Sequence, residues 1–374
     1  MSLSARRLAP WLVAAFIIVI GSVAMAVSAL PDKPHQQSVH IEQSTDNGFV
    51  FGVDYADQLP EESETGIARS LDDPGAVGAS WIRVDLAWYR IEPNPGTWDW
   101  SSFDREVDYA KARGLRILAI LDQPPAWARA RACAKQVWCP PQDDTRFAAF
   151  AARAAQRYPA DVVAAWEVWN EENLGSYWLG GPDPEGYGAL LKATSIAVRA
   201  VQPKAQLLVG GLAVAGSDGT NLSAQDFLID VARSNFLRYA TAVAYHPYSF
   251  PTVPASAKAF GDISTRPGSL ASILDRYQQS SMPIWLTEAG APVSDAANDP
   301  GAAESATKDQ ERLQAAYAAD LVTAATGNPH VKALFWFSDI DLPDQRLYFG
   351  LRRADGSSRP ALTAFKNAIA AYRG

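Results

Sequence analysis

Residues 162–173 read VVAAWEVWNEEN, and this stretch decides the fold. Its first eight residues are apolar except for one glutamate, which is the composition of a strand that is buried on both faces. Polar residues follow directly. Similar apolar runs recur along the chain, at residues 49–53, 81–85, 115–121, 206–211, 241–246, 283–288 and 333–338. We therefore expect eight strands.

Stretches with helical signals separate these runs. Asp183-Pro184 is a helix cap followed by proline at the first helical position, and apolar residues then recur at helical spacing. Gly327 ends another amphipathic stretch, and Arg359-Pro360 opens the last one. Strands that alternate with helices in this way predict an α/β fold, a single (β/α)8 TIM barrel. An open doubly wound sheet also alternates, but its phosphate-binding first turn is missing from this sequence.

The chain begins with a segment that is typical of exported proteins. Arg6 and Arg7 precede an uncharged apolar run from about residue 8 to residue 30. Such a run is close to the ~20 residues that span a bilayer, and the arginines favour a cytoplasmic N-terminus. We predict that residues 1–30 are a transmembrane anchor or a cleaved signal peptide, residues 31–47 a linker and residues 48–374 the barrel. On either alternative the barrel lies outside the cytoplasm, anchored in the membrane or secreted.

The two cysteines of the chain, Cys133 and Cys139, lie close together in the sequence. In an oxidising compartment we expect such a pair to form a disulfide, which stiffens the short loop between them. A reactive thiol is the alternative.

Composition limits the partners of the protein. The 374 residues are 48% hydrophobic and 20% charged, which favours a packed core over a disordered chain. The net charge of −8 disfavours nucleic-acid binding. With only 4 histidines and 2 cysteines, and without a glycine-rich phosphate loop, we expect neither a metal site nor an organic cofactor. No sequence feature indicates an oligomer, so we expect a monomer.

Two of the apolar runs end in glutamates. The fourth run leads into Asn170-Glu171, and the seventh ends at Glu288. In a barrel the carboxyl ends of all strands meet at the face that carries the active site, and strands four and seven lie on opposite sides of that mouth. Two carboxylates ~5–5.5 Å apart suit the cleavage of a glycosidic bond with retention, because one protonates the leaving oxygen and the other attacks the anomeric carbon.

These residues resemble a known family. The motifs WNE at 169–171 and WLTE at 285–288 are similar to those of clan A retaining glycoside hydrolases, closest to glycoside hydrolase family 39 and its bacterial exopolysaccharide-hydrolase branch. The resemblance implies that Glu171 is the acid/base and Glu288 the nucleophile. It also implies that Arg83, in the WIRVD motif, braces the nucleophile.

Further motifs match the same family over most of the barrel. His246 and Tyr248 belong to a YHPY motif that resembles the family's strand-six motif near the nucleophile. Trp336 matches the aromatic residue under the bound sugar. Trp127 and Trp178 lie in the loops after the third and fourth runs, where each either lines the cleft or packs beneath it. The expected substrate-binding residues are Arg83, Asn170, His246, Tyr248, Trp336, Trp127 and Trp178.

One position departs from the family pattern, which is Asn-Glu-Pro-Asn. Glu172 replaces the proline, and a second carboxylate at this place can raise the pKa of Glu171 or bind substrate. We interpret Glu172 either as a solvated rim charge or as a substrate contact. Strict alternation along the fourth strand, without a bulge, puts Glu167, Trp169 and Glu171 on one face. The same rule puts Glu288 on the face of the seventh strand that carries the apolar residues at 284 and 286.

The sequence therefore predicts a retaining glycosidase that acts on a cell-envelope or extracellular polysaccharide. Glu288, kept ionised by Arg83, is expected to form a glycosyl-enzyme while Glu171 donates a proton, and Glu171 then activates water. The pKa of Glu171 has to be raised for it to hold that proton. Two alternatives stay open: a catalytically silent glycan-binding protein on the same barrel, and a transglycosylase that remodels polysaccharide.

Overall fold

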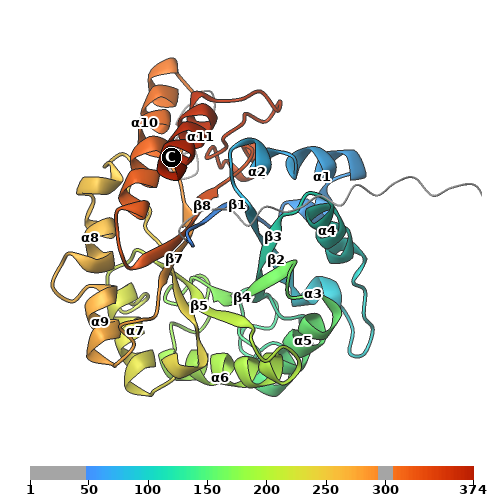
Figure 1. The fold of residues 1–374 in the computed structure, drawn as a ribbon. Coiled ribbons are helices and arrows are strands. Elements are labelled where there is room, and N and C mark those ends of the chain that lie inside the picture. The colour runs from blue at the N-terminus through green and yellow to red at the C-terminus, as the bar shows by residue number, and fades with distance from the viewer. Residues whose placement is uncertain (1–47, 294–305) are drawn as a thin grey trace, which may run out of the picture. The chain divides into compact units, whose positions relative to one another are not determined.

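A closed barrel of eight parallel strands forms the centre of the structure, a computed structural model that describes residues 48–293 and 306–374 (Figure 1). The strands pair in sequence order, and β8 closes the barrel by pairing with β1. Each expected run coincides with a strand to within a few residues, so the predicted TIM barrel is confirmed. The strands are β1 (Val50–Ala56), β2 (Trp81–Ala87), β3 (Arg116–Asp122), β4 (Val163–Asn170), β5 (Gln206–Ala213), β6 (Ala242–His246), β7 (Ile284–Ala289) and β8 (Val331–Phe337).

Helices follow the strands and surround the barrel (Figure 1). Several begin where the sequence predicts: the Asp183 carboxylate accepts a hydrogen bond from the Gly186 amide at the start of α6. The α-helices are α1 (Glu64–Ser70), α2 (Asp73–Ala76), α3 (Trp88–Ile91), α4 (Ser101–Ala112), α5 (Asp144–Arg157), α6 (Pro184–Val201), α7 (Ala224–Arg233), α8 (Lys258–Ser264), α9 (Leu270–Arg276), α10 (Lys308–Thr326) and α11 (Pro360–Arg373). Short 3-10 helices are η1 (Leu59–Glu61), η2 (Leu237–Tyr239), η3 (Pro254–Ser256) and η4 (Pro343–Gln345).

Two apolar layers make up the core. The inner layer fills the barrel, where the rings of Trp81 and Trp285 meet edge to face with centroids 5.6 Å apart, beside Phe335. Gly52 makes room for Phe335, since a Cβ at this position would lie 2.2 Å from its ring. The outer layer lies between strands and helices and draws on the alternate strand positions. Burial of both strand faces explains why the strands appear in the sequence as continuous apolar runs.

A polar layer lies on this apolar floor, toward the carboxyl ends of the strands. On β2, the inward positions proceed from Trp81 in the floor to Arg83 and then to Asp85. On β4, Ala165 belongs to the floor and Glu167 is the next inward residue. This layer contains the side chains that form the candidate active site.

The loop between β3 and α5 carries the expected disulfide. Cys133 and Cys139 are bonded, with their Cα atoms 5.5 Å apart. The prediction of a disulfide is confirmed.

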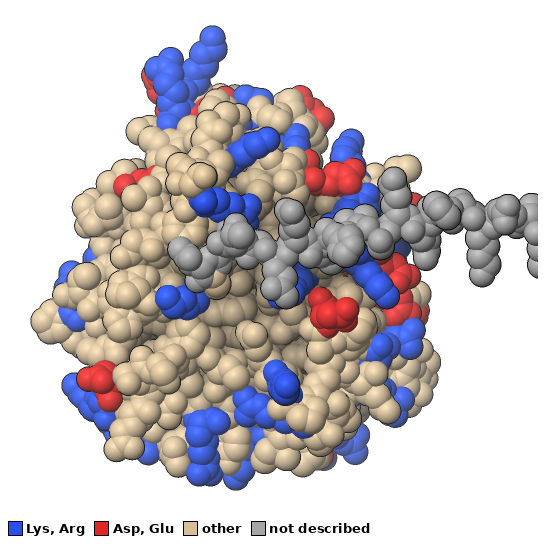
Figure 2. Space-filling view, in the orientation of Figure 1, with Lys and Arg blue, Asp and Glu red and all other residues tan. Residues whose placement is uncertain are grey.

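The N-terminal segment that we interpret as an anchor or signal peptide lies outside the described residues. Among the residues that the structure does describe, no helix has the length and apolar character to cross a membrane. On the face seen in Figure 2, Lys and Arg side chains are scattered and interspersed with Asp and Glu.

Candidate active site

Arg83 is the centre of a buried ion-pair network below the barrel mouth. Its Nη1 donates to Asp54 Oδ2 at 2.8 Å and to Glu288 Oε1 at 2.7 Å. Its Nε and Nη2 donate to the two oxygens of Glu167, each at 3.0 Å. Nη2 also donates to Asn170 Oδ1 at 2.8 Å. The planar guanidinium thus orients residues from β1, β4 and β7 at the same time.

Glu288 is held as an anion. Besides Arg83, the Tyr248 hydroxyl donates to its Oε2 at 3.0 Å, and His246 Nδ1 lies 3.6 Å from the same oxygen. Burial alone would raise the pKa of Glu288, but the charges of His246 and Arg83 outweigh burial and lower it. A carboxylate that stays ionised is available to act as a nucleophile.

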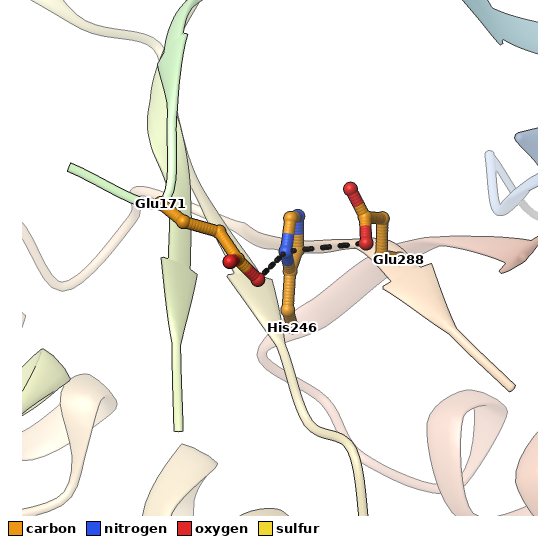
Figure 3. Close-up of side chains that lie close together, drawn as sticks. All are labelled: Glu171, His246 and Glu288. Carbon is orange, nitrogen blue, oxygen red and sulfur yellow. Dashed lines mark hydrogen bonds and ion pairs between the residues drawn. The ribbon is translucent and has the colours of Figure 1, made fainter. Parts of the chain in front are cut away.

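Glu171 lies across from Glu288, with the imidazole of His246 between the two carboxylates (Figure 3). His246 Nδ1 is 3.0 Å from Glu171 Oε1, and its Nε2 is 3.1 Å from Thr287 Oγ1. Thr287 Oγ1 in turn donates to Glu167, so it accepts from Nε2 and leaves Nδ1 to share a proton with Glu171. Burial raises the pKa of Glu171 although His246 opposes the shift.

The distance between the two carboxylates suits retention. One oxygen of Glu171, one oxygen of Glu288 and a nitrogen of His246 all lie within 4.8 Å of one another. About a seventh of each glutamate side chain is exposed, with 13% for Glu171 and 14% for Glu288. The same three groups could ligate a metal ion by distance alone, but the Arg83 cation 2.7 Å from Glu288 opposes a second positive charge there.

Irregular backbone brings both glutamates into the mouth. Trp169 and Glu171 have positive φ angles of 73° and 51°, and the ring of Trp169 packs outward against Trp178 with centroids 5.1 Å apart. The expected common face for residues 167, 169 and 171 is therefore wrong. The β7–β8 register also shifts between Leu286 and Ala289, so Glu288 turns inward while Leu286 packs in the outer layer. Strict alternation fails at both strand ends.

The expected aromatic platform is not formed by Trp336. Its side chain is completely buried, its Nε1 donates to the Phe349 carbonyl, and its ring packs on Phe365 of α11. Alternation along β8 explains the error, because Phe335 faces the barrel interior and its neighbour must face the helices. Trp178 is also buried, against Trp169 and Tyr187, which favours the packing alternative for this residue.

Trp127 is half-buried, and its contacts are with residues other than the two glutamates. Its Nε1 donates to the Glu92 carbonyl, its ring meets Trp88, and Arg146 lies over its face. It lines a surface cavity of about 300 Å³ together with Trp98. The structure gives Trp127 no contact with the carboxylate pair.

Other aromatic residues lie at the mouth. The half-buried rings of Tyr248 and Phe349 meet edge to face at 5.8 Å, and Phe349 meets Phe337 at 5.5 Å. Burial, and then the charges of Glu171 and Glu288, raise the pKa of Tyr177. The sequence pattern offers only a weak signal for these residues: Phe337 ends a strand, whereas Phe349 and Tyr177 are loop positions.

Glu172 has neither of its expected roles. It is completely buried, and its carboxylate lies against Gly210, where an added Cβ would be 2.2 Å from Oε2. The Tyr187 hydroxyl lies beside it but donates to the Val168 carbonyl, so neither carboxyl oxygen has a hydrogen bond of regular geometry among the described residues. Burial raises its pKa well above the usual range, so Glu172 is a neutral buried acid rather than a rim charge or a substrate contact.

The comparison with known families agrees with this geometry. The family model for cellulase (glycosyl hydrolase family 5) matches residues 61–338. The chain belongs to this family. The resemblance to clan A glycoside hydrolases is confirmed. A search of curated proteins finds no match.

Solved structures of this family and of family 39 share the fold. A family 39 glycoside hydrolase from the gut symbiont Bacteroides cellulosilyticus WH2 is 22% identical, with a TM-score of 0.67 over 88% of this chain and 65% of that one. A monomeric beta-xylosidase from Caulobacter crescentus CB15 is 18% identical, with a TM-score of 0.61 over 86% and 68%. GH5_18 from Streptomyces cattleya, in complex with GlcNAc, is 20% identical, with a TM-score of 0.60 over 87% and 80%.

Proposed function

We propose that this family member is an exported glycosidase that hydrolyses a cell-envelope or extracellular polysaccharide by double displacement, with Glu288 as nucleophile and Glu171 as acid/base. One observation supports the roles of nucleophile for Glu288 and acid/base for Glu171. The two carboxylates share one mouth within 4.8 Å, and their pKa values are shifted in opposite directions. An acid and a nucleophile require such a difference.

In the first step Glu171 gives its proton to the glycosidic oxygen while Glu288 attacks the anomeric carbon. The bond from carbon to the leaving oxygen breaks, and a bond from the same carbon to Glu288 forms. Arg83 and Tyr248 hold the attacking carboxylate in place. Because the buried network orients Glu288 before substrate binds, little reorganisation accompanies attack.

In the second step Glu171, now ionised, accepts a proton from water. The water oxygen bonds to the anomeric carbon and Glu288 departs as a carboxylate, so the configuration is retained overall. His246 Nδ1 shares a hydrogen bond with Glu171 and stabilises its ionised form through this cycle. As Glu288 loses its charge in the glycosyl-enzyme, its electrostatic effect on Glu171 also changes.

Asn170 and the aromatic residues of the mouth position the sugar. Asn170 accepts from Arg83 through Oδ1, which leaves its amide nitrogen to donate to a sugar hydroxyl. The half-buried rings of Tyr248 and Phe349 provide an apolar surface for a sugar face.

Support for the polymer and the location comes from the N-terminal apolar run and from the resemblance to exopolysaccharide hydrolases. An enzyme that carries such a segment encounters polymers outside the cytoplasm. The disulfide is consistent with an oxidising compartment. We propose a monomer held at the membrane by residues 1–30 or released after their removal.

The direct test incubates the full-length chain with a panel of envelope and extracellular polysaccharides and measures new reducing ends. We expect cleavage by the wild type and none by Glu288→Gln. A 2-deoxy-2-fluoro glycoside of the released sugar, bearing a good leaving group, should label Glu288 covalently. A label on another residue would overturn the nucleophile assignment.

The same experiment separates the alternatives. Transfer to an added sugar acceptor in preference to water would identify a transglycosylase, which uses the same glycosyl-enzyme. Tight binding of a polymer without any cleavage, by a wild-type chain that is folded, would support the glycan-binding alternative instead.

A further inference from the structure

A second group of acidic side chains lies at the barrel mouth, apart from the catalytic pair. Asp85 is the inward residue of β2 that follows Arg83, and Asp122 is the last residue of β3. The register joins the two strands, with Asp85 opposite Ile120 and Ala87 opposite Asp122. Both aspartates therefore occupy the layer above Arg83, on the side of the mouth next to β4.

Gln123 links the two aspartates. Its amide nitrogen lies 3.2 Å from Asp85 Oδ2 and 3.4 Å from Asp122 Oδ2. All three side chains are nearly or completely buried, with exposures of 9% for Asp85, 0% for Asp122 and 6% for Gln123. One oxygen, Asp122 Oδ1, is buried without any hydrogen-bond partner among the described residues. A buried acceptor with no donor is a group that a ligand can satisfy.

The pair also lacks a cation of its own. Arg83, whose charge acts on both aspartates, already binds Asp54, Glu167 and Glu288. In the described part of the chain, neither Asp85 nor Asp122 forms an ion pair. Burial, followed by the charge of the neighbouring aspartate, raises the pKa of Asp85 well above its ordinary value. Without a cation beside them, burial favours the neutral form of both aspartates, and a bound cation would favour their ionised form.

The group lies beside the strand that leads to the catalytic acid. β3 pairs with β4, and Ile120 lies opposite Glu167, so Asp122 is next to the strand end that carries Asn170 and Glu171. Burial, and then the charges of Glu171, Glu288 and Asp85, raise the pKa of the half-buried Tyr177.

We propose that Asp85, Asp122 and Gln123 form a subsite for a sugar with a free amino group, so that the preferred polysaccharide contains hexosamine units that are not N-acetylated. This inference rests on the proposed function and names the substrate class of the same cleft. An ammonium group donates three hydrogen bonds and carries the positive charge that the site lacks. An N-acetyl group offers one donor and no charge, and it has to fit a nearly buried site.

The experiment measures binding and cleavage separately. Glucosamine and galactosamine polymers with free amino groups are compared with the same polymers after chemical N-acetylation. Binding is measured by calorimetry on the full-length Glu288→Gln chain, which does not turn over substrate, and cleavage on the wild type. We expect at least one free-amine polymer to bind about 10-fold more tightly than its acetylated form, and added salt to reduce the preference.

Isosteric variants then identify the residues that cause the preference for the free-amine polymer. Asp122→Asn and Asp85→Asn, each combined with Glu288→Gln, should lose most of it, whereas Asp104→Asn, in an aspartate paired with Arg157 on the outside of the barrel, should keep it. Thermal unfolding checks that each variant is folded. Because Asn keeps the shape of Asp, a preference that survives both mouth substitutions would overturn the proposal.

The remaining outcomes separate the two proposals. Equal binding of the free-amine and acetylated polymers, or no binding of either, would overturn the amino-sugar subsite. Preferential binding of the free-amine form without cleavage by the wild type would support the subsite and contradict the hydrolytic function. Cleavage of a polysaccharide by the wild type, together with equal binding of the free-amine and acetylated polymers, would support the hydrolase and reject the subsite.

Discussion

Arg83 on β2 and Glu288 at the end of β7 meet at 2.7 Å, although 205 positions separate them in the sequence. The guanidinium simultaneously holds Asp54 and Glu167, so it cannot follow Glu288 if that side chain moves. The nucleophile is consequently oriented by residues of the barrel interior, the most rigid part of a TIM barrel.

Arg83→Lys should lower kcat/KM by roughly 30-fold, which corresponds to about 2 kcal/mol for the lost charge-assisted hydrogen bonds. Lysine keeps the charge but lacks the planar fork that contacts several carboxylates at once. Weaker stabilisation of the anion should raise the pKa of Glu288 and move the acid limb of the pH profile to higher pH. Arg90→Lys, in a pair with Asp57 outside the network, is the control. An unchanged acid limb would contradict the proposed role of Arg83.

The pH profile of kcat/KM should be bell-shaped and should depend on His246. Activity requires ionised Glu288, whose pKa is lowered, and protonated Glu171, whose pKa is raised. The charge of His246 lowers the pKa of both carboxyl groups, so His246→Asn should move both limbs to higher pH. His330→Asn is the matched control. If the two limbs stay in place in His246→Asn, the imidazole does not tune the pair.

Trp336 and Phe349 should respond differently to substitution. Trp336→Phe removes a buried indole and its hydrogen bond to the Phe349 carbonyl, so it should lower the free energy of unfolding by about 1–3 kcal/mol and leave kcat/KM unchanged. Phe349→Ala should instead raise KM by about 10-fold, because an aromatic contact contributes about 0.5–1.5 kcal/mol. Denaturant unfolding and steady-state kinetics distinguish the two effects. A large rise in KM for Trp336→Phe would restore the platform that the resemblance implies.

Glu172→Gln should stabilise the protein at neutral pH without loss of activity. The folded state keeps Glu172 protonated because burial raises its pKa, whereas the unfolded chain releases this proton above pH ~4.3. The wild type therefore loses stability as pH rises above that value, and the glutamine variant is spared this loss. We expect a gain of about 1 kcal/mol or more at pH 8 and a smaller gain at pH 5, measured by urea unfolding. Glu185→Gln, an exposed position on α6, should show no such difference, and a gain independent of pH would argue against a protonated Glu172.

Local sequence patterns were sufficient for the barrel but not for its mouth. Apolar runs such as 162–169 and the cap at Asp183 report burial and hydrogen bonding within a few residues, and both were predicted at the correct places. Trp336 shows the limit. A motif match suggested a sugar platform, but the inward turn of the neighbouring Phe335 commits the tryptophan to the helix side. The prediction of an exposed role for Glu172 was wrong for a similar reason. The sequence does not show that the strand end turns this side chain against Gly210.

The sequence by itself determined the eightfold alternation of strands and helices, the disulfide and the identities of the two glutamates at the ends of β4 and β7. These features depend on periodicity, spacing and motif, which are local properties of the chain. Only the tertiary structure decided that both glutamates face each other, since positive φ angles in β4 and a register shift in β7 override strict alternation. It also decided their opposite pKa shifts, because these arise from burial and from charges that β2 and β6 bring into the same mouth.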